Sequence, residues 1–292
     1  MSVNGDFEQF CSNLRMSADT VTKIQKRYNT ITKRINSDYR ILDSETSYSL
    51  YVGSYGRGTE IWTSDIDILV QLPYKTYAKF NRYNTNGQSA LLQEVRESLR
   101  KTYPTSFIKG DGQVIGINFT DSINFEIVPA FINTNNSYTY PDSNAGGTWK
   151  TTNPKAEMTA MRERNNATNK NLKRLCRMVR SWKGNHDVNM SGILIDTLAY
   201  NFINQWEYKN KSYLYYDLMS RDFFKYLKNI DKSVTSWKAP GSNRNVYKSG
   251  NFQIKAKIAY LNTLSAIDYE TRSMPITSRN KWREIYGSKF PK

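Results

Sequence analysis

The chain has 292 residues, 38% of them hydrophobic, and a formal net charge of +16. This length is enough for one large domain or two modest ones with a buried core. No apolar run is long enough to span a bilayer or resembles a signal peptide, and two cysteines and one histidine are too few for a disulfide framework or a zinc site. We therefore expect a cytoplasmic protein that does not enter membranes.

The positive charge lies almost wholly in the C-terminal half. Residues 1–50 carry 7 basic and 6 acidic side chains, residues 51–150 carry 9 of each, and residues 151–292 carry 26 basic and 11 acidic ones. A basic lobe facing a carboxylate-bearing lobe suits a cleft for nucleoside triphosphates, and its outer surface suits RNA or DNA. For any one patch, the alternative is a lysine-rich surface that is merely solvated.

The N-terminal half predicts helices and then a sheet. Apolar residues recur at helical spacing over residues 5–14 and 17–40, and the second segment is long enough to form a spine. Apolar side chains recur at every second position of residues 46–52, which predicts a strand that leads into Gly53. A short helix, two longer helices and three short strands follow in chain order: residues 56–61, 75–83, 89–103, 106–109, 114–119 and 123–131.

A glycine-rich segment, Gly53-Ser54-Tyr55-Gly56-Arg57-Gly58, precedes a strand with two carboxylates. Its glycines let backbone N–H groups converge on an anion such as a triphosphate. In the strand, Asp65 and Asp67 are two residues apart, so both side chains point to the same face. Two carboxylates this close repel each other, so they need a cation between them. Ligation by oxygen atoms alone favours magnesium. The alternative is a plain turn before an edge strand with solvated acids.

This order of motifs resembles the nucleotidyltransferases of the DNA polymerase β superfamily, which share a Gly-Ser motif followed by an Asp-x-Asp pair. The resemblance implies an α+β fold: a polymerase β-like core, with a mixed sheet flanked by helices, and a helical C-terminal lobe around a central active-site cleft. It also implies that two Mg²⁺ ions, or Mn²⁺ in their place, are held by Asp65, Asp67 and a third carboxylate that acts on the acceptor hydroxyl.

Glu126 occupies the position of that third carboxylate. It precedes a hydrophobic-Val-Pro-Ala run in an otherwise apolar strand, where aspartate is the commoner residue in the superfamily. The longer side chain leaves the geometry around the metal open. A solvated residue at a strand edge is the alternative for Glu126.

The C-terminal half predicts mainly helices. A long helix over residues 155–183 has an apolar stripe and, on the opposite face, a basic one. The apolar stripe consists of Leu172, Leu175, Val179 and Trp182, and the basic one of Lys170, Lys173, Arg177 and Arg180. Further helices are predicted at residues 191–206, 217–229 and 251–269, with residues 237–250 as a loop.

Motifs after residue 140 narrow the resemblance. Before the long helix stand Tyr140-Pro141-Asp142, Gly147-Thr148-Trp149 and Thr152-Asn153-Pro154; near the end stand Trp282-Arg283, Ile285-Tyr286-Gly287 and Phe290-Pro291. This succession resembles the bacterial relatives of the animal cytosolic DNA sensor, the CD-NTases, which make cyclic oligonucleotides in the anti-phage CBASS systems. The resemblance covers most of residues 50–292.

The resemblance implies a nucleotide-binding set. Gly53 and Ser54 would hold the donor triphosphate. Arg180, in Arg180-Ser181-Trp182, stands where the family has a lysine that reaches the triphosphate, and the Arg-x-Trp variant is similar to a subgroup with guanine-containing products. A surface cation is the alternative for Arg180. Ser191 lies where relatives read the donor base, and it could equally be a helix N-cap.

We therefore expect a metal-dependent nucleotidyltransferase that converts nucleoside triphosphates, purines and GTP among them, into a cyclic oligonucleotide, most simply a cyclic dinucleotide, and releases pyrophosphate. The product would act on a downstream effector in anti-phage defence, and RNA or DNA would activate the enzyme on its basic C-terminal lobe. The expected domains are N-terminal helices (residues 1–45), a catalytic core (46–150) and a helical nucleotide-binding lobe (151–292). The alternatives are an RNA-tailing or protein-modifying nucleotidyltransferase and an inactive RNA-sensing module.

Overall fold

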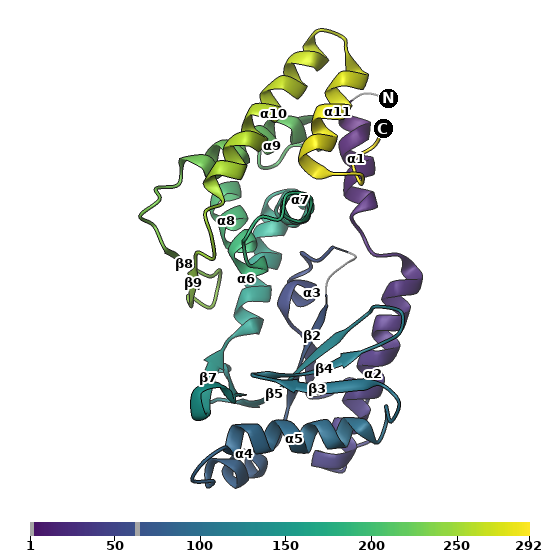
Figure 1. Cartoon of the computed structure of the whole chain (residues 1–292), viewed down its shortest axis with the longest axis vertical. Helices are drawn as coiled ribbons and strands as arrows, with labels where there is room; N and C mark the ends of the chain where they lie inside the picture. Colours follow the sequence, from purple (N-terminus) through teal and green to yellow (C-terminus); the bar gives the residue numbers. More distant parts are fainter. Residues whose placement is uncertain (1–2, 62–64) are drawn as a thin grey trace. The chain divides into compact units, whose positions relative to one another are not determined.

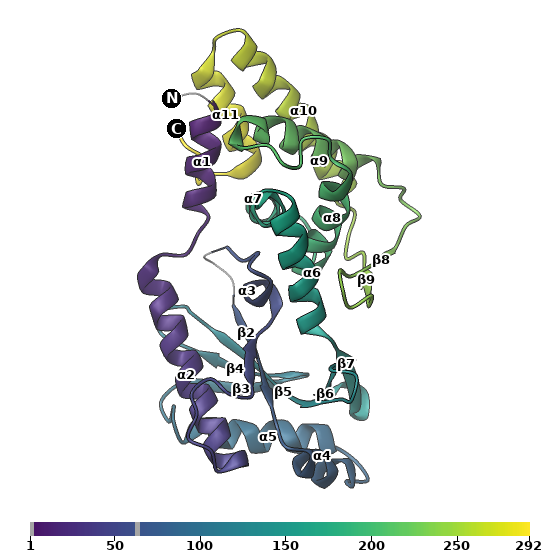
Figure 2. The ribbon, with the colours of Figure 1, turned by 180° about the vertical axis from the view of Figure 1, so that it is seen from behind.

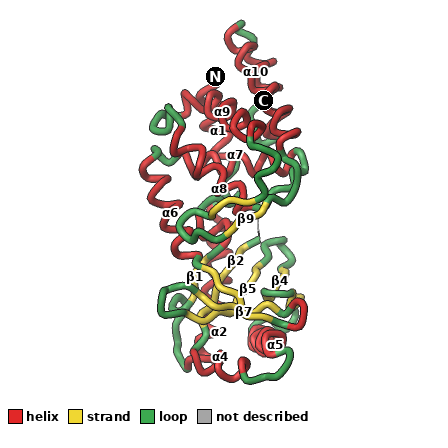
Figure 3. Tube along the Cα trace, turned by 90° about the vertical axis from the view of Figure 1, so that its left-hand side faces the viewer, coloured by secondary structure: helices red, strands yellow, loops and turns green. Residues whose placement is uncertain are grey.

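The computed structural model describes residues 3–61 and 65–292. Contacts within the chain divide it into two compact units. We call them the sheet unit, Met16–Gly56 and Thr63–Lys155, and the helical unit, Met1–Arg15, Arg57–Trp62 and Ala156–Lys292. Figure 1 labels the elements, and Figure 3 shows by colour which parts are strands and which are helices. None of the described helices has both the length and the apolar character that a bilayer crossing requires.

A seven-stranded mixed sheet forms the sheet unit. Its order is β1-β2-β5-β4-β3, with β6 paired to β5 and β7 to β6. The pair β2 and β5 is parallel, whereas the other pairs in this sheet are antiparallel. The strands are β1 (Ser49–Tyr51), β2 (Ile66–Gln71), β3 (Phe107–Asp111), β4 (Val114–Asn118), β5 (Phe125–Ile132), β6 (Tyr138–Asp142) and β7 (Thr148–Thr152).

One face of this sheet is covered by helices α2 (Ala18–Arg40) and α5 (Gly87–Arg100), and α4 (Tyr74–Asn81) packs beside α5 (Figure 1). Alternate residues of the central strands are buried there with the apolar stripes of the helices, as the period of two requires. These core residues include Ile66, Ile68, Ile115, Ile117, Phe125 and Ile127 from the strands and Ile24, Ile31, Leu91 and Val95 from the helices. The intervening strand residues therefore point to the opposite face, which this core does not cover.

Helices build the other unit around an aromatic core. Phe7 of the N-terminal helix packs edge-on against Trp282 and Phe290, with ring centroids 5.0 and 5.2 Å apart, so both ends of the chain lie side by side (Figure 2). The elements are α1 (Val3–Asn13), α6 (Pro154–Ala167), α7 (Asn171–Asn185), α8 (Gly192–Gln205), η2 (Tyr213–Tyr215), α9 (Tyr216–Asn229), β8 (Ser236–Lys238), β9 (Asn245–Tyr247), α10 (Gln253–Thr271) and α11 (Pro275–Tyr286).

The expected fold class is confirmed, but the single helix predicted over residues 155–183 is wrong. The chain forms α6 and α7 instead, because Asn169 and Lys170 adopt positive φ angles of 47° and 65°. Polar side chains satisfy the backbone at this break: Asn165 Oδ1 accepts from the backbone N–H of Lys173 at 3.0 Å. Asparagine competes in this way with helical hydrogen bonds, which the apolar periodicity does not reveal.

Other elements are also placed differently from the prediction. The short helix is α3 (Gly53–Arg57), which contains the Gly-Ser motif, rather than a helix over residues 56–61. The predicted loop over residues 237–250 contains most of the β8–β9 hairpin, and the sequence did not predict β6, β7 or α11. These three elements are short or lack a clear apolar period, so they form through tertiary contacts.

Candidate active site

The glycine-rich motif and the acidic strand meet at Gly53 and Asp67. Gly53 begins α3 with a positive φ of 59°, and a Cβ atom at this position would lie 1.8 Å from Asp67 Oδ2. The backbone of Val52 donates to the carbonyl of Asp67 at 2.9 Å. The carboxylate of Asp67 therefore lies directly against the Gly53 backbone, which only glycine permits.

We predict that Gly53→Ala loses both stability and turnover. The added methyl group must displace Asp67, and alanine is strained at this φ, so the loss of stability should exceed about 1 kcal/mol. Gly184→Ala is the matched control, because a Cβ atom there meets nothing within 4 Å and alanine favours the helix. Thermal denaturation and pyrophosphate release measure the two effects; a Gly53→Ala protein as stable and active as the Gly184→Ala protein would contradict this geometry.

Asp67 and Glu126 are paired residues on the parallel strands β2 and β5. Residues in register on neighbouring strands share a face and lie about 5 Å apart at the backbone. Both side chains are partly exposed, on the sheet face opposite the α2 and α5 core. The structure thus brings Gly53, Asp67 and Glu126 together within one unit, with Ser54 next to Gly53 in α3.

Asp65 lies immediately before β2, and one of its carboxylate oxygens accepts a hydrogen bond. Asn124 Nδ2, from the segment just before β5, donates to Asp65 Oδ1 at 3.2 Å. Among the described residues, no three His, Cys, Asp or Glu side chains are already grouped as a metal site. Asp65 is nevertheless near enough for its charge to raise the pKa of Glu126.

The negative charge of this cluster acts on the pKa of Glu126. Burial, followed by the charges of Asp67 and Asp65, raises the pKa of Glu126 from 4.5 to about 7. Like charges that cannot separate keep one carboxyl protonated unless a cation intervenes. The carboxylate oxygens of Asp65, Asp67 and Glu126 are the donors that a hard divalent ion prefers, so this set fits Mg²⁺ or Mn²⁺.

We predict that the metal-free protein loses stability as pH rises from 6 to 8. A carboxyl with a raised pKa binds more protons in the folded than in the unfolded state, so its protonation stabilises the fold below about pH 7 and that contribution is lost above it. Because Glu126 is partly exposed, we expect a change on the order of 1 kcal/mol. Mg²⁺ should restore more stability at pH 8 than at pH 6.

Urea denaturation at the two pH values, with and without Mg²⁺, measures this effect. Glu126→Gln is the control, since it cannot titrate and should show a smaller pH dependence. Equal pH dependence in the native and Glu126→Gln proteins would show that Glu126 does not carry the effect.

Arg180 belongs to the helical unit, where it forms a buried ion pair. Its guanidinium is only 7% exposed, and it donates to Asp196 Oδ1 at 2.6 Å and Oδ2 at 2.9 Å. It also donates to the carbonyls of Cys176 and Gly192, at 3.3 and 3.0 Å. Arg180 is therefore not the surface cation of the alternative, and its role in nucleotide binding stays a prediction.

Ser191 is the N-cap of α8. Ser191 Oγ accepts a hydrogen bond from the backbone N–H of Leu194 at 3.3 Å, and Ser191 is exposed to solvent. The capping alternative is therefore present in the structure. An exposed hydroxyl also keeps a lone pair and a proton for another partner.

The sequence analysis missed an ion network around Asp196 in the helical unit. Asp196 is fully buried and accepts from Arg57 Nε at 2.8 Å and from Thr59 Oγ1 at 2.9 Å, besides Arg180. Burial opposes ionisation, but Arg180 and Arg57 outweigh it and hold the pKa of Asp196 well below its usual value. The signal was available: Asp196 is the one acid in the apolar helix α8, and a buried acid needs a cation.

Comparison with known proteins identifies the family. A family profile described as "Second Messenger Oligonucleotide or Dinucleotide Synthetase domain" (SMODS) matches residues 1–165. A probable cyclic nucleotide synthase of Bacillus cereus (strain VD146) is 26% identical over 179 residues, which cover 57% of this chain and 51% of that protein. The match thus spans about half the length of this relative.

Solved structures share the fold over nearly the whole chain. CdnC of E. coli MS115-1, in a complex with HORMA-deltaN, has a TM-score of 0.72 at 16% identity and covers 99% of this chain and 98% of its own. The STING-associated CdnE c-di-GMP synthase of Capnocytophaga granulosa has a TM-score of 0.67 at 17% identity, over 90% of this chain and 85% of its own. The profile spans more than half of the sequence, so this chain belongs to the SMODS family and has the nucleotidyltransferase fold of the CD-NTases.

Proposed function

We propose that this protein joins nucleoside triphosphates into a cyclic oligonucleotide and releases pyrophosphate. The membership in the SMODS family supports this function. The single observation that carries it is the position of Asp67, which lies between the Gly53 backbone on one side and its strand partner Glu126 on the other. A phosphate-binding turn and a pair of carboxylates in one place are what nucleotidyl transfer requires.

In each step, the acceptor hydroxyl oxygen attacks the α-phosphorus of the donor, and the bond from this phosphorus to the bridging oxygen breaks, so that pyrophosphate leaves. Gly53 and Ser54 bind the donor phosphates. Glu126 receives the proton of the acceptor hydroxyl. Mg²⁺ held by Asp65, Asp67 and Glu126 would neutralise the charge on the phosphates. A second transfer within the linear intermediate closes the ring.

Purine nucleotides are the substrates we propose. Related structures include CdnC with ATP and a CdnG in complex with GTP, each described for its own protein. Here, Ser191 at the start of α8 offers an exposed hydroxyl to a base. We propose that Arg180 contributes to nucleotide binding by fixing the start of α8, where Ser191 lies, because its guanidinium donates to Asp196 and to the Gly192 carbonyl.

Product analysis tests the function. The protein is incubated with the four ribonucleoside triphosphates, singly and mixed, with Mg²⁺, and the products are treated with phosphatase and analysed by mass spectrometry. Phosphatase-resistant products with the mass of a cyclic purine oligonucleotide are expected. Products that keep a terminal phosphate, extended RNA or a nucleotidylated protein would point to an RNA-tailing or protein-modifying enzyme, and absence of turnover would refute the proposal.

We further propose that RNA or DNA binds the helical unit and activates the enzyme. The supporting observation is a cavity of about 790 Å³ in this unit, which five cations and one acid, Glu8, line. The cations are Arg15, Lys170, Lys173, Arg174 and Arg177. Burial and the charge of Arg177 lower the pKa of Lys173, as expected where cations gather without enough counter-charge.

Arg15→Glu with Lys170→Glu should weaken nucleic-acid binding and its salt dependence, because both residues are exposed and reversing them removes phosphate contacts. Lys225→Glu, exposed on α9, is the control. Fluorescence anisotropy with labelled RNA and DNA at several salt concentrations measures binding. Turnover that does not respond to added nucleic acid would exclude the activating role.

A further inference from the structure

Helix α10 of the helical unit exposes its large apolar side chains and buries small ones. The exposed fractions of Ile254, Ile258, Leu261 and Leu264 are 60, 52, 50 and 40%. The buried positions of the helix are instead Gln253, Ala256, Ala259, Thr263 and Ala266. A helix that only has to pack within its own chain shows the opposite arrangement, with its large apolar residues facing the core.

The buried face of α10 packs within the helical unit without these four side chains. There, α10 contacts both α9 and α11 (Figure 1). Small residues at such contacts let the helix axes come close together. Each isoleucine or leucine on the exposed face would contribute about 1.5–3 kcal/mol if another surface buried it fully. Because contiguous exposed apolar surface marks an interaction site, we infer that this face of α10 has a partner.

The four exposed residues form one stripe along α10. They follow one another at intervals of four, three and three residues, so at 3.6 residues per turn they fall within an arc of roughly 120° of the helix surface. Lys257 lies in the same arc toward the start of α10, and Asp268 lies in it toward the end. The stripe therefore has a cation near one end and an anion near the other.

The positions of these charges make the stripe complementary to itself. Lys257 and Asp268 lie equally far from the midpoint between residues 262 and 263, and so do Leu261 and Leu264. Both charges are accessible: Lys257 is exposed, and Asp268 contacts Arg272 at 3.1 Å in a surface pair of the kind that contributes little to stability. An antiparallel copy of α10 centred on this midpoint therefore places opposite charges against each other and leucine against leucine.

We propose that the exposed stripe of α10 is the interface of a symmetric dimer, in which it pairs antiparallel with α10 of a second copy of this chain. Lys257 then meets the partner subunit's Asp268, Leu261 meets the partner subunit's Leu264, and the two-fold axis repeats each contact. A parallel pairing would bring like charges together instead. Four half-exposed aliphatic side chains supply only part of the about 800 Å² per partner that a typical specific interface buries, so the dimer forms at micromolar rather than nanomolar concentrations.

Sedimentation velocity of the full chain, from low to high micromolar concentration, measures the dimer. Leu261→Glu should raise the dissociation constant at least about 100-fold, because each dimer carries the substitution twice and a buried glutamate would lack a partner. Leu214→Glu is the matched control, since Leu214 is a 56% exposed leucine on η2 of the same unit, and it should associate like the native protein. A native protein that stays monomeric over the whole range would refute the proposal.

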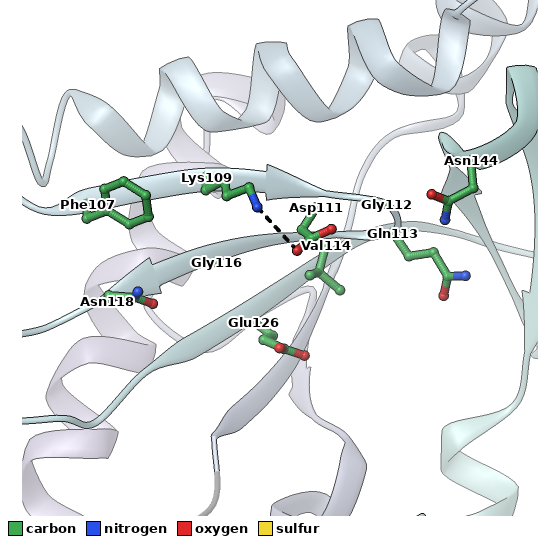
Figure 4. Close-up of a pocket in the computed structure, with 10 residues that line it drawn as sticks. All are labelled: Phe107, Lys109, Asp111, Gly112, Gln113, Val114, Gly116, Asn118, Glu126 and Asn144. Carbon is green, nitrogen blue, oxygen red and sulfur yellow. Dashed lines mark ion pairs between the residues drawn. The ribbon is translucent and has the colours of Figure 1, made fainter. Parts of the chain in front are cut away.

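These substitutions lie outside the candidate active site. Glu126 and the cavity of about 460 Å³ that it lines belong to the sheet unit (Figure 4), whereas α10 belongs to the helical unit. Sedimentation also needs no substrate. The existence of the dimer is therefore decided whether or not the protein transfers nucleotides.

Charge reversal tests the antiparallel pairing itself. Lys257→Asp and Asp268→Lys each bring like charges together at both ends of the interface, so each variant alone should have a dissociation constant at least about tenfold above the native value. In an equal mixture, the two variants restore both contacts between opposite charges. Native mass spectrometry distinguishes them by mass and should show more of the mixed dimer than of either homodimer. A mixture that dimerises no better than either variant alone would refute this pairing.

Discussion

Asp67→Asn is expected to abolish turnover while leaving the fold at least as stable. The amide keeps the shape of the side chain against Gly53 but removes one charge from the cluster, so the transition-state charge is no longer balanced and turnover should fall by about 10³-fold. In the absence of metal at pH 8, removal of one of the repelling carboxylates should raise the melting temperature by about 2 °C. The stabilisation by Mg²⁺ should be lost.

Glu97→Gln is the matched control for this variant. Glu97 is an exposed carboxylate on α5 in the same unit, paired with Arg96, and its amide should change neither turnover nor the response to Mg²⁺. Pyrophosphate release and differential scanning fluorimetry provide both readouts. An Asp67→Asn protein with near-native turnover would contradict the assignment, and one that fails to fold would show that Asp67 is structural.

Asp196→Ala is expected to cause the largest loss of stability. Its removal leaves Arg57 and Arg180 as buried cations without a counter-charge at this carboxylate, a change that typically costs about 3–5 kcal/mol. For a chain of this size, the melting temperature should fall by roughly 10 °C. Because Arg57 is the last residue of α3, which begins with Gly53 and Ser54, turnover should also fall at temperatures where the variant is folded.

Asp268→Asn is the control for the Asp196 variant, since the side chain of Asp268 is half exposed and its partner Arg272 is a surface residue. Thermal denaturation distinguishes the two variants: the melting temperature of the Asp268→Asn control should lie within about 2 °C of the native value. Similar melting temperatures for both variants would show that the network around Asp196 contributes little. In that case Glu157, which accepts a hydrogen bond from Arg244 at 2.7 Å, would be the acid that mainly stabilises this part of the helical unit.

The sequence predicted strands at the positions of β1 to β5 because the period of two is strong there. Asp67 and Glu126 can be recognised in the sequence because each is an acid within an apolar strand. The parallel pairing of β2 with β5 places these two residues side by side. The glycine requirement at Gly53 also follows from its motif, although the contact with Asp67 that explains it is visible only in the structure.

The parts that the sequence did not predict depend on tertiary contacts. The break between α6 and α7 arises where Asn165 and Asn171 hydrogen-bond to backbone groups, and the latter donates to the carbonyls of Lys209 and Lys211, some forty residues away. The burial of Arg180 depends on Asp196 of the next helix, which the basic periodicity of α7 alone could not indicate. A spacing rule within one helix cannot report a partner on another.

Crystals of the protein grown with Mn²⁺ and a non-hydrolysable nucleoside triphosphate test the central claim most directly, because Mn²⁺ scatters anomalously. The account predicts two anomalous peaks about 3.5–4 Å apart, within coordination distance of Asp65, Asp67 and Glu126, with the triphosphate at Gly53 and Ser54. Peaks at other residues, or a triphosphate bound away from the Gly53 turn, would contradict it.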